Sequence, residues 1–185
     1  MPREVRRTAQ AIGDTRNQLA KHARVVSRTT LARSEIAMIE VSSTAFQPDG
    51  NIPSSYTCDG LGLSPPLSWS GVPDNAVSVA ILVDDPDASD QPFLHWLVTD
   101  IPPSVHVLDE GAAMPRESLT TESDAGTASY FGPCPPSGRH HYHFHVYALD
   151  TALGEAPADR DAFLAAICGH VIDEGELVGM YEHVA

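Results

Sequence analysis

The amino-acid sequence predicts a mainly β domain, an antiparallel β-sandwich, and three observations support this prediction. Short runs rich in β-branched and aromatic residues recur along the chain, with turn residues between them. Only one segment has clear helical spacing, whereas an α/β fold needs a helix after most strands. Fifteen prolines are spread through the chain, which favours short strands joined by turns and loops.

Six segments are predicted to be strands. The run from Val77 to Val83 is almost continuously apolar, as expected of a buried strand, and it should end where the turn-forming residues Asp84, Asp85 and Pro86 begin. Leu67 and Trp69 are two residues apart, so their side chains share one face of a strand. The predicted strands occupy residues 38–41, 67–69, 77–83, 93–98, 139–149 and 176–181.

The apolar spacing within residues 159–168 predicts the one clear helix, near the C-terminus. Asp159 is suited to accept a hydrogen bond at its N-terminus, and Gly169 is suited to end it. A long polar loop is expected over residues 104–130, and loops of that length usually have a function.

The strand over residues 139–149 is unusually rich in histidine, and its alternation divides these side chains between two faces. One face carries His140, Tyr142, Phe144 and Val146. The other carries His141, His143, His145 and Tyr147. His140 and Tyr142 therefore lie side by side, next to a loop stiffened by three prolines, and this arrangement predicts the wall of a small-molecule site.

Length and cysteine content restrict the class of protein. A chain of 185 residues is expected to form one domain, and it has neither a long apolar run that could span a membrane nor the apolar core of a secretory signal. Three cysteines are too few for a disulfide framework, so Cys58 and Cys134 are expected to be free thiols in a reducing compartment. We therefore expect a cytoplasmic protein.

The charge is distributed unevenly. From Ser34 onward there are 23 acidic residues and only three arginines, with no lysine, so this part has a net charge near −20. Two interpretations remain open: adaptation to high internal salt, or an ordinary acidic cytosolic protein. Nucleic acid is not expected as a partner of so acidic a surface.

Residues 1–37 differ from the rest of the chain, because eight of the eleven basic residues lie before Ser34. We expect a basic N-terminal extension, either flexible or the result of a wrongly assigned start at Met1 instead of Met38. A targeting peptide is the alternative. The ligand-binding domain is expected over residues 38–185.

Four motifs in this order resemble the phosphatidylethanolamine-binding proteins, and among them the bacterial and archaeal Raf-kinase-inhibitor-like branch. They are Asp-Pro-Asp-Ala at 85–88, His-Trp-Leu-Val at 95–98, Gly-Pro at 132–133 and His-His-Tyr at 140–142. The resemblance covers residues 38–185. Ser89, Gly62 and Ala125 stand where the family often has Pro, Asn and an aromatic residue, in loops near the expected site.

The resemblance implies a Greek-key β-sandwich with one or two short helices near the C-terminus and an anion-binding pocket at one end. The implied binding residues are Asp85, Asp87, His95, Gly132, Pro133, His140 and Tyr142. The family binds phosphate-like groups, including phospholipid head groups, and some members inhibit kinases or proteases. These properties predict a binding protein without enzymatic activity or a cofactor, with a kinase, a protease or a second copy in a homodimer as partner.

Chemistry of the side chains agrees with an anion site. His95, His140 and Tyr142 can donate hydrogen bonds to phosphate oxygens, and Asp85 can orient an imidazole or bind the ammonium of ethanolamine. The alternative is a metal-binding protein or enzyme that uses His141, His143 and His145, although alternate residues on a strand lie nearly 7 Å apart. A serine hydrolase is disfavoured, because the Gly-x-Ser-x-Gly motif does not occur.

Overall fold

The computed structural model describes residues 38–183, so the predictions for residues 1–37 lie outside the described part. Its elements in chain order are β1 (Glu40–Ser42), β2 (Gly50–Asn51), the 3-10 helix η2 (Ser54–Tyr56), β3 (Leu67–Ser70), β4 (Ser78–Asp85), β5 (Phe93–Ile101), β6 (Val107–Leu108), β7 (Leu119–Thr121), β8 (Arg139–Leu149), α2 (Arg160–Ile167) and β9 (Val171–Glu182).

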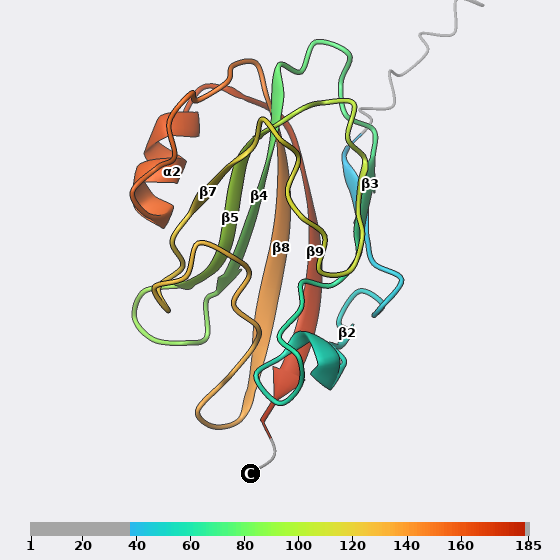
Figure 1. Cartoon of the computed structure of the whole chain (residues 1–185), viewed down its shortest axis with the longest axis vertical. Helices are drawn as coiled ribbons and strands as arrows, with labels where there is room; N and C mark the ends of the chain where they lie inside the picture. The colour runs from blue at the N-terminus through green and yellow to red at the C-terminus, as the bar shows by residue number, and fades with distance from the viewer. Residues whose placement is uncertain (1–37, 184–185) are drawn as a thin grey trace, which may run out of the picture. The chain divides into compact units, whose positions relative to one another are not determined.

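The strands form two sheets (Figure 1). The larger sheet has the order β2-β9-β8-β4-β5-β7, and the smaller sheet has the order β1-β3-β6. All neighbouring strands are antiparallel except β2 and β9, which pair in parallel over two residues. The predicted mainly β sandwich is therefore confirmed.

The principal core fills the space between the two sheets. It includes Val41, Leu67, Trp69 and Leu108 from the smaller sheet, and Ile81, Val83, Trp96, Phe144, Val146 and Leu177 from the larger one. The alternation predicted for Leu67 and Trp69 is confirmed, since both are buried here. Burial of apolar surface is worth roughly 25 cal/mol per Å², so this layer is the main source of stability.

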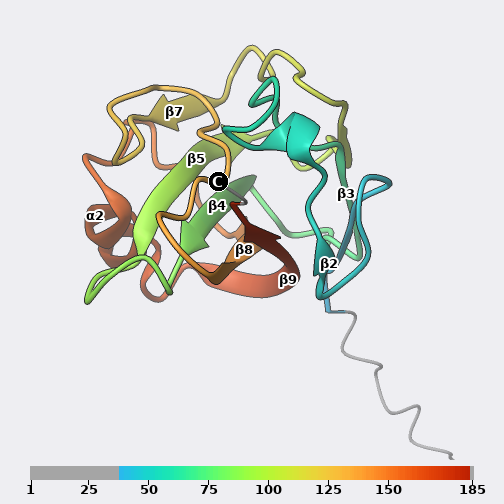
Figure 2. The same cartoon turned by 90° about the horizontal axis from the view of Figure 1, so that it is seen from below.

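A second, smaller core lies on the outer face of the larger sheet, where α2 packs. Phe163 and Ile167 of the helix are buried against Ala80, Leu82 and Tyr147. Figure 2 shows α2 and β3 on opposite sides of the larger sheet. Because β4 is thus covered on both faces, all eight of its residues are buried. Burial of Val79 to Val83 agrees with the predicted apolar run, whereas Val77, its predicted first residue, is exposed and lies outside the strand.

The predicted helix is confirmed. The side chain of Asp159 accepts a hydrogen bond of 2.8 Å from the backbone N–H of Ala162, which satisfies one of the free amides of the first turn. Gly169 follows the helix with φ of +83°, a conformation that a side chain would strain.

Several strand boundaries differ from the prediction, and the short strands β2, β6 and β7 were not predicted, the last two lying within the expected 104–130 loop. β4 continues through Asp84 and Asp85, for which the sequence predicts the beginning of a turn. Both carboxylates are buried and paired with cationic or imidazole groups, so tertiary contacts override the local turn preference. β9 begins at Val171, five residues before the predicted start at Glu176, because long pairing with β8 extends it.

The prediction of free thiols at Cys58 and Cys134 is wrong. The two residues form a disulfide bond that joins loops 76 residues apart, with a Cα–Cα distance of 5.4 Å. Counting cysteines does not reveal it, because only the fold brings these loops together. The argument for a reducing compartment, which rested on free thiols, loses its basis, and cytoplasmic location stays a prediction.

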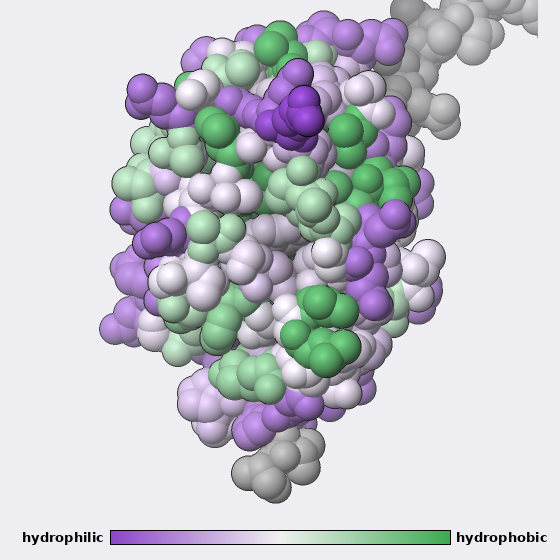
Figure 3. All heavy atoms as spheres, in the orientation of Figure 1, coloured by the Kyte–Doolittle hydropathy of each residue, from purple (hydrophilic) through white to green (hydrophobic). Residues whose placement is uncertain are grey.

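The surface is mixed in character. On the face drawn in Figure 3, apolar side chains form separate groups among polar ones. Within residues 38–183, no helix is long and apolar enough to span a membrane.

Candidate functional site

A cavity of about 360 Å³ lies where β4 ends and β5 and β8 begin. Figure 1 shows these strands in the larger sheet. Its lining residues are Asp85, Ala88, Phe93, His95, Phe131, Cys134, Pro135, Pro136, His140 and Tyr142. Four of the seven predicted binding residues are among them, namely Asp85, His95, His140 and Tyr142. The structure therefore brings these four titratable members of the predicted set together at one cavity, and their role in binding stays a prediction.

Strand alternation on β8 places His140 and Tyr142 on the inner face. Both are buried, whereas the intervening His141 is exposed, as predicted. β4 and β8 are hydrogen-bonded neighbours, and Asp84 pairs with His143, so Asp85 lies beside the start of β8. As a result, Nδ1 of His140 lies 2.7 Å from Oδ2 of Asp85.

A β-bulge in β5 directs His95 into the cavity. Val83 pairs with Trp96 and Asp84 pairs with Leu94, so one step along β4 corresponds to two steps along β5. The extra residue is His95, and such bulges commonly re-aim side chains at functional sites. Both His95 and Trp96 are consequently buried on the inner side of the sheet.

The ring of His95 is held by a backbone carbonyl. Its Nδ1 lies 2.7 Å from the carbonyl oxygen of Phe131, to which the Nδ1–H donates. Burial lowers the pKa of His95, although the Phe131 carbonyl and nearby carboxylates oppose this effect. The free ring is thus mainly neutral near pH 7, with Nε2 able to accept a hydrogen bond.

The hydroxyl group of Tyr142 is buried and has no hydrogen-bond partner within residues 38–183. The ring of Tyr142 meets the ring of His95 edge-on, with centroids 5.1 Å apart. Burial raises the pKa of Tyr142 far above its usual range, so the phenol keeps its proton. The Asp85 and Asp87 carboxylates add to this effect, and Asp85 is near enough to interact with the hydroxyl although no hydrogen bond of normal geometry joins them. A buried donor without a partner costs about 1–3 kcal/mol, which a bound polar ligand or water would offset.

The other three predicted residues support the cavity from outside its lining. Asp87 accepts hydrogen bonds from the backbone N–H and Nδ1 of His141, at 2.9 and 2.7 Å, and its own N–H donates to Asp85. These bonds from His141 lower the pKa of Asp87. The carbonyl of Pro133 accepts from the N–H of Cys58.

Gly132 permits close packing of the loop that forms one rim. A side chain here would place Cβ 2.7 Å from the carbonyl oxygen of Tyr56, closer than such atoms can approach. The glycine therefore lets the rim pack against η2, and the disulfide between Cys58 and Cys134 joins the same two regions.

Sequence reasoning missed the apolar part of the lining. Phe93 and Phe131 flank the His95 ring, with centroids 4.8 and 5.8 Å from it. Cys134, Pro135 and Pro136 complete the rim. The proline-rich turn is recognisable in the sequence as a stiff neighbour of His140, but nothing in its sequence indicates which of its residues face the cavity.

A second cavity, of about 370 Å³, lies between parts of the long loop and the 62–64 segment. Its lining residues are Gly62, Leu63, Ser64, Trp96, Gly111, Ala112, Ala113, Met114, Thr120, Ala128, Ser129 and Tyr130. It contains no histidine or carboxylate, and the hydroxyl of Tyr130 already donates to the carbonyl of Tyr56 at 3.2 Å. The first cavity is therefore the better candidate for polar recognition.

The three outward-facing histidines of β8, His141, His143 and His145, do not form one cluster. His141 pairs with Asp87, whereas His143 pairs with Glu176 on β9. The predicted grouping of His141 with His143 and His145 is thus not the arrangement in the structure.

Comparison with known proteins identifies the family. Residues 42–182 match the family described as phosphatidylethanolamine-binding protein. A UPF0098 protein of Methanothermobacter thermautotrophicus is 46% identical over 148 residues, covering 77% of this chain and 98% of the relative. A UPF0098 protein of Pyrococcus abyssi is 46% identical over 154 residues, covering 78% of this chain and 85% of the relative.

Two solved structures of similar fold point to the same family. A protein of Chlamydia trachomatis, described as a homologue of phosphatidylethanolamine-binding protein, has a TM-score of 0.74 and 37% identity, covering 80% of this chain and 99% of its own. Escherichia coli YbcL, described as a member of the mammalian family, has a TM-score of 0.73 and 31% identity, covering 80% of this chain and all of its own. On its motifs, its fold and these relatives, the chain belongs to the phosphatidylethanolamine-binding protein family, in its bacterial and archaeal branch.

Proposed function

We propose that the cavity binds a small anion of the phosphate class, either free or as part of a phosphorylated head group. Membership of a family of binding proteins supports a binding role. The observation that carries the proposal is the buried, unpaired hydroxyl of Tyr142, which lies beside two histidines in a cavity that is otherwise mostly apolar. A few directed polar groups in an apolar cleft are typical of small-ligand sites.

The hydrogen-bonding groups define what the anion must offer. Tyr142 is a donor, and His140 donates from Nε2 when its ring is protonated, because Nδ1 faces Asp85. Neutral His95 instead offers an acceptor at Nε2, since its Nδ1–H is bonded to Phe131. A phosphate that carries one proton satisfies both requirements, with an oxygen for each donor and a P–OH for His95.

Asp85 limits the charge that the cavity tolerates. Its carboxylate is buried, and its pairing with His140 brings the negative charge close to a cationic group when that ring is protonated. The donors of Tyr142 and His140 must therefore outweigh the repulsion between the Asp85 carboxylate and a bound anion.

Calorimetric titration with inorganic phosphate and with phosphoethanolamine tests this proposal. Tyr142→Phe should weaken phosphate binding by about 1.5–3 kcal/mol, the usual contribution of a hydrogen bond to a charged group. Tyr130→Phe is the matched control, because that partly buried hydroxyl is already bonded to Tyr56 and lies at the other cavity. Absence of phosphate binding by the unmodified protein, or equal losses in the two variants, would show that the proposal is wrong.

A further inference from the structure

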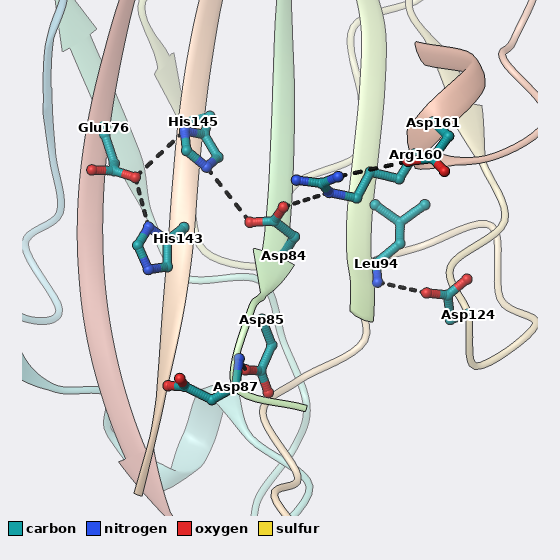
Figure 4. Close-up of polar contacts among 10 residues, drawn as sticks. All are labelled: Asp84, Asp85, Asp87, Leu94, Asp124, His143, His145, Arg160, Asp161 and Glu176. Carbon is teal, nitrogen blue, oxygen red and sulfur yellow. Dashed lines mark hydrogen bonds and ion pairs between the residues drawn. The ribbon is translucent and has the colours of Figure 1, made fainter. Parts of the chain in front are cut away.

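A cluster of two histidines and one glutamate lies on the outer face of the larger sheet, away from the cavity just described. His143 and His145 come from β8 and Glu176 comes from β9. Figure 4 shows Glu176 beside the two rings, with contacts from its carboxylate to both. Oε1 of Glu176 lies 2.6 Å from Nδ1 of His143 and 3.5 Å from Nδ1 of His145. Three potential metal ligands therefore converge on one point.

Strand pairing explains how residues that are two apart on one strand can share a centre. Glu176 is directly opposite His145 in the β8–β9 ladder, so its carboxylate reaches the gap between the two rings from the side. The rings are nearly parallel, with centroids 5.8 Å apart and planes inclined by 22°. The neighbouring strand thus supplies the third group, which the histidine run by itself does not contain.

A buried carboxylate lies near the second nitrogen of His145. Its Nε2 lies 3.5 Å from Oδ1 of Asp84, a carboxylate that is only 4% exposed. Nε of Arg160 donates to the other oxygen of Asp84 at 2.6 Å and fixes it (Figure 4). Metal-bound histidines generally donate their other N–H to a carboxylate, and Asp84 is close enough to accept such a bond from His145 after a small movement of the ring.

We propose that His143, His145 and Glu176 bind a divalent transition-metal ion of the zinc class, with water at the remaining position. Nδ1 of each histidine and one carboxylate oxygen would be the ligands. The three ligand atoms lie within 4.8 Å of one another, and bonds of about 2.0 Å require spacings of roughly 3.3 Å in a tetrahedral site. Rotation of these partly exposed side chains would bring the three ligand atoms from their present spacing to the spacing that a bound ion requires.

The ligand types and the surroundings favour this class of metal. Two imidazoles and one carboxylate suit Zn²⁺ and its transition-metal neighbours, whereas Mg²⁺ and Ca²⁺ prefer sites built of oxygen. His143, His145 and Glu176 are 27%, 24% and 43% exposed, so an ion and a water ligand can reach the site from solvent. The strongly acidic character of the chain also raises the local concentration of cations.

One other group of metal-binding residue types occurs within residues 38–183, at Cys58, Asp59 and His183. Its sulfur is part of the disulfide with Cys134, so this group lacks a thiolate to bind a metal. It provides a control position for the experiment.

The experiment is a calorimetric titration of the untagged full-length protein with ZnCl₂, with MgCl₂ in parallel. We expect one Zn²⁺ bound per chain and no heat from Mg²⁺. His143→Ala and Glu176→Gln should each weaken Zn²⁺ binding at least tenfold. His141→Ala and His183→Ala should leave it unchanged within twofold, since His141 lies on the same strand face but pairs with Asp87.

Circular dichroism of each variant separates loss of binding from loss of folding. If His143→Ala does not fold, Glu176→Gln decides, because it keeps the size of the side chain. The proposal is overturned if the unmodified protein binds no Zn²⁺ at millimolar concentration, if the folded Glu176→Gln variant binds as well as the unmodified protein, or if His141→Ala loses as much affinity as the cluster variants.

Discussion

Nδ1 of His140 lies 2.7 Å from Oδ2 of Asp85, and the two side chains are only 11% and 4% exposed. The carboxylate fixes the orientation of the ring, so the opposite nitrogen is held in a constant direction at the cavity wall. Two residues that are 55 positions apart in the sequence, on neighbouring strands, thus create one directed polar group, Nε2 of His140.

This pairing makes the contribution of His140 testable. His140→Ala should weaken phosphate binding by about 1.5–3 kcal/mol, the usual worth of a charge-assisted hydrogen bond. His141→Ala should change the affinity little, because that side chain lies on the other face and pairs with Asp87. Calorimetric titration of both variants measures the difference. Equal effects would mean that the cavity is not the anion site.

The buried His95 should make stability depend on pH. Because burial lowers its pKa in the folded state, the unfolded chain takes up this proton first as the pH falls. The stability linked to neutral His95 is therefore complete above about pH 6.5 and declines as the pH falls towards the lowered pKa.

Urea denaturation at several pH values between 5 and 8 isolates this contribution when the protein is compared with His95→Asn, whose amide does not titrate in this range. The difference in free energy of unfolding between the two proteins should shrink towards acidic pH, since only the unmodified protein has an imidazole at position 95. Parallel pH profiles would contradict the buried neutral state of His95.

The disulfide between Cys58 and Cys134 should contribute to stability by restricting the unfolded chain across a separation of 76 residues. Removing it with Cys58→Ser and Cys134→Ser together should cost roughly 2–4 kcal/mol in the free energy of unfolding. Cys168→Ser is the control, because that cysteine is free and exposed. An unchanged urea midpoint in the double variant would show that the bond does not form in solution.

Stability should also rise with salt. The excess of acidic residues from Ser34 onward repels itself at low ionic strength, and salt at roughly 1 M shortens the screening length to about 3 Å. We expect the melting temperature to increase with KCl up to molar concentrations. A melting temperature that is flat from dilute buffer to 1 M KCl would disprove the interpretation as adaptation to high salt.

The sequence alone determined the features that depend on neighbouring residues. Alternation along residues 139–149 separated His140 and Tyr142 from His141, because successive side chains of a strand point to opposite faces. The helix and its Asp159 cap were predictable for the same reason, since capping involves residues only three positions apart. The four motifs, each a short run of adjacent residues, were by themselves enough to indicate the family.

The tertiary structure alone decided which distant residues meet. Pairing of β4 with β8 brought Asp85 to His140, and a bulge in β5 turned His95 inward. Pairing of β9 with β8 brought Glu176 to His143 and His145. The disulfide was missed, and the pairing of Glu176 with His143 and His145 was not foreseen, for one physical reason. Contacts of this kind depend on strand register and on loop closure between residues that lie far apart in the chain. Local sequence patterns contain no information about register or about loop closure.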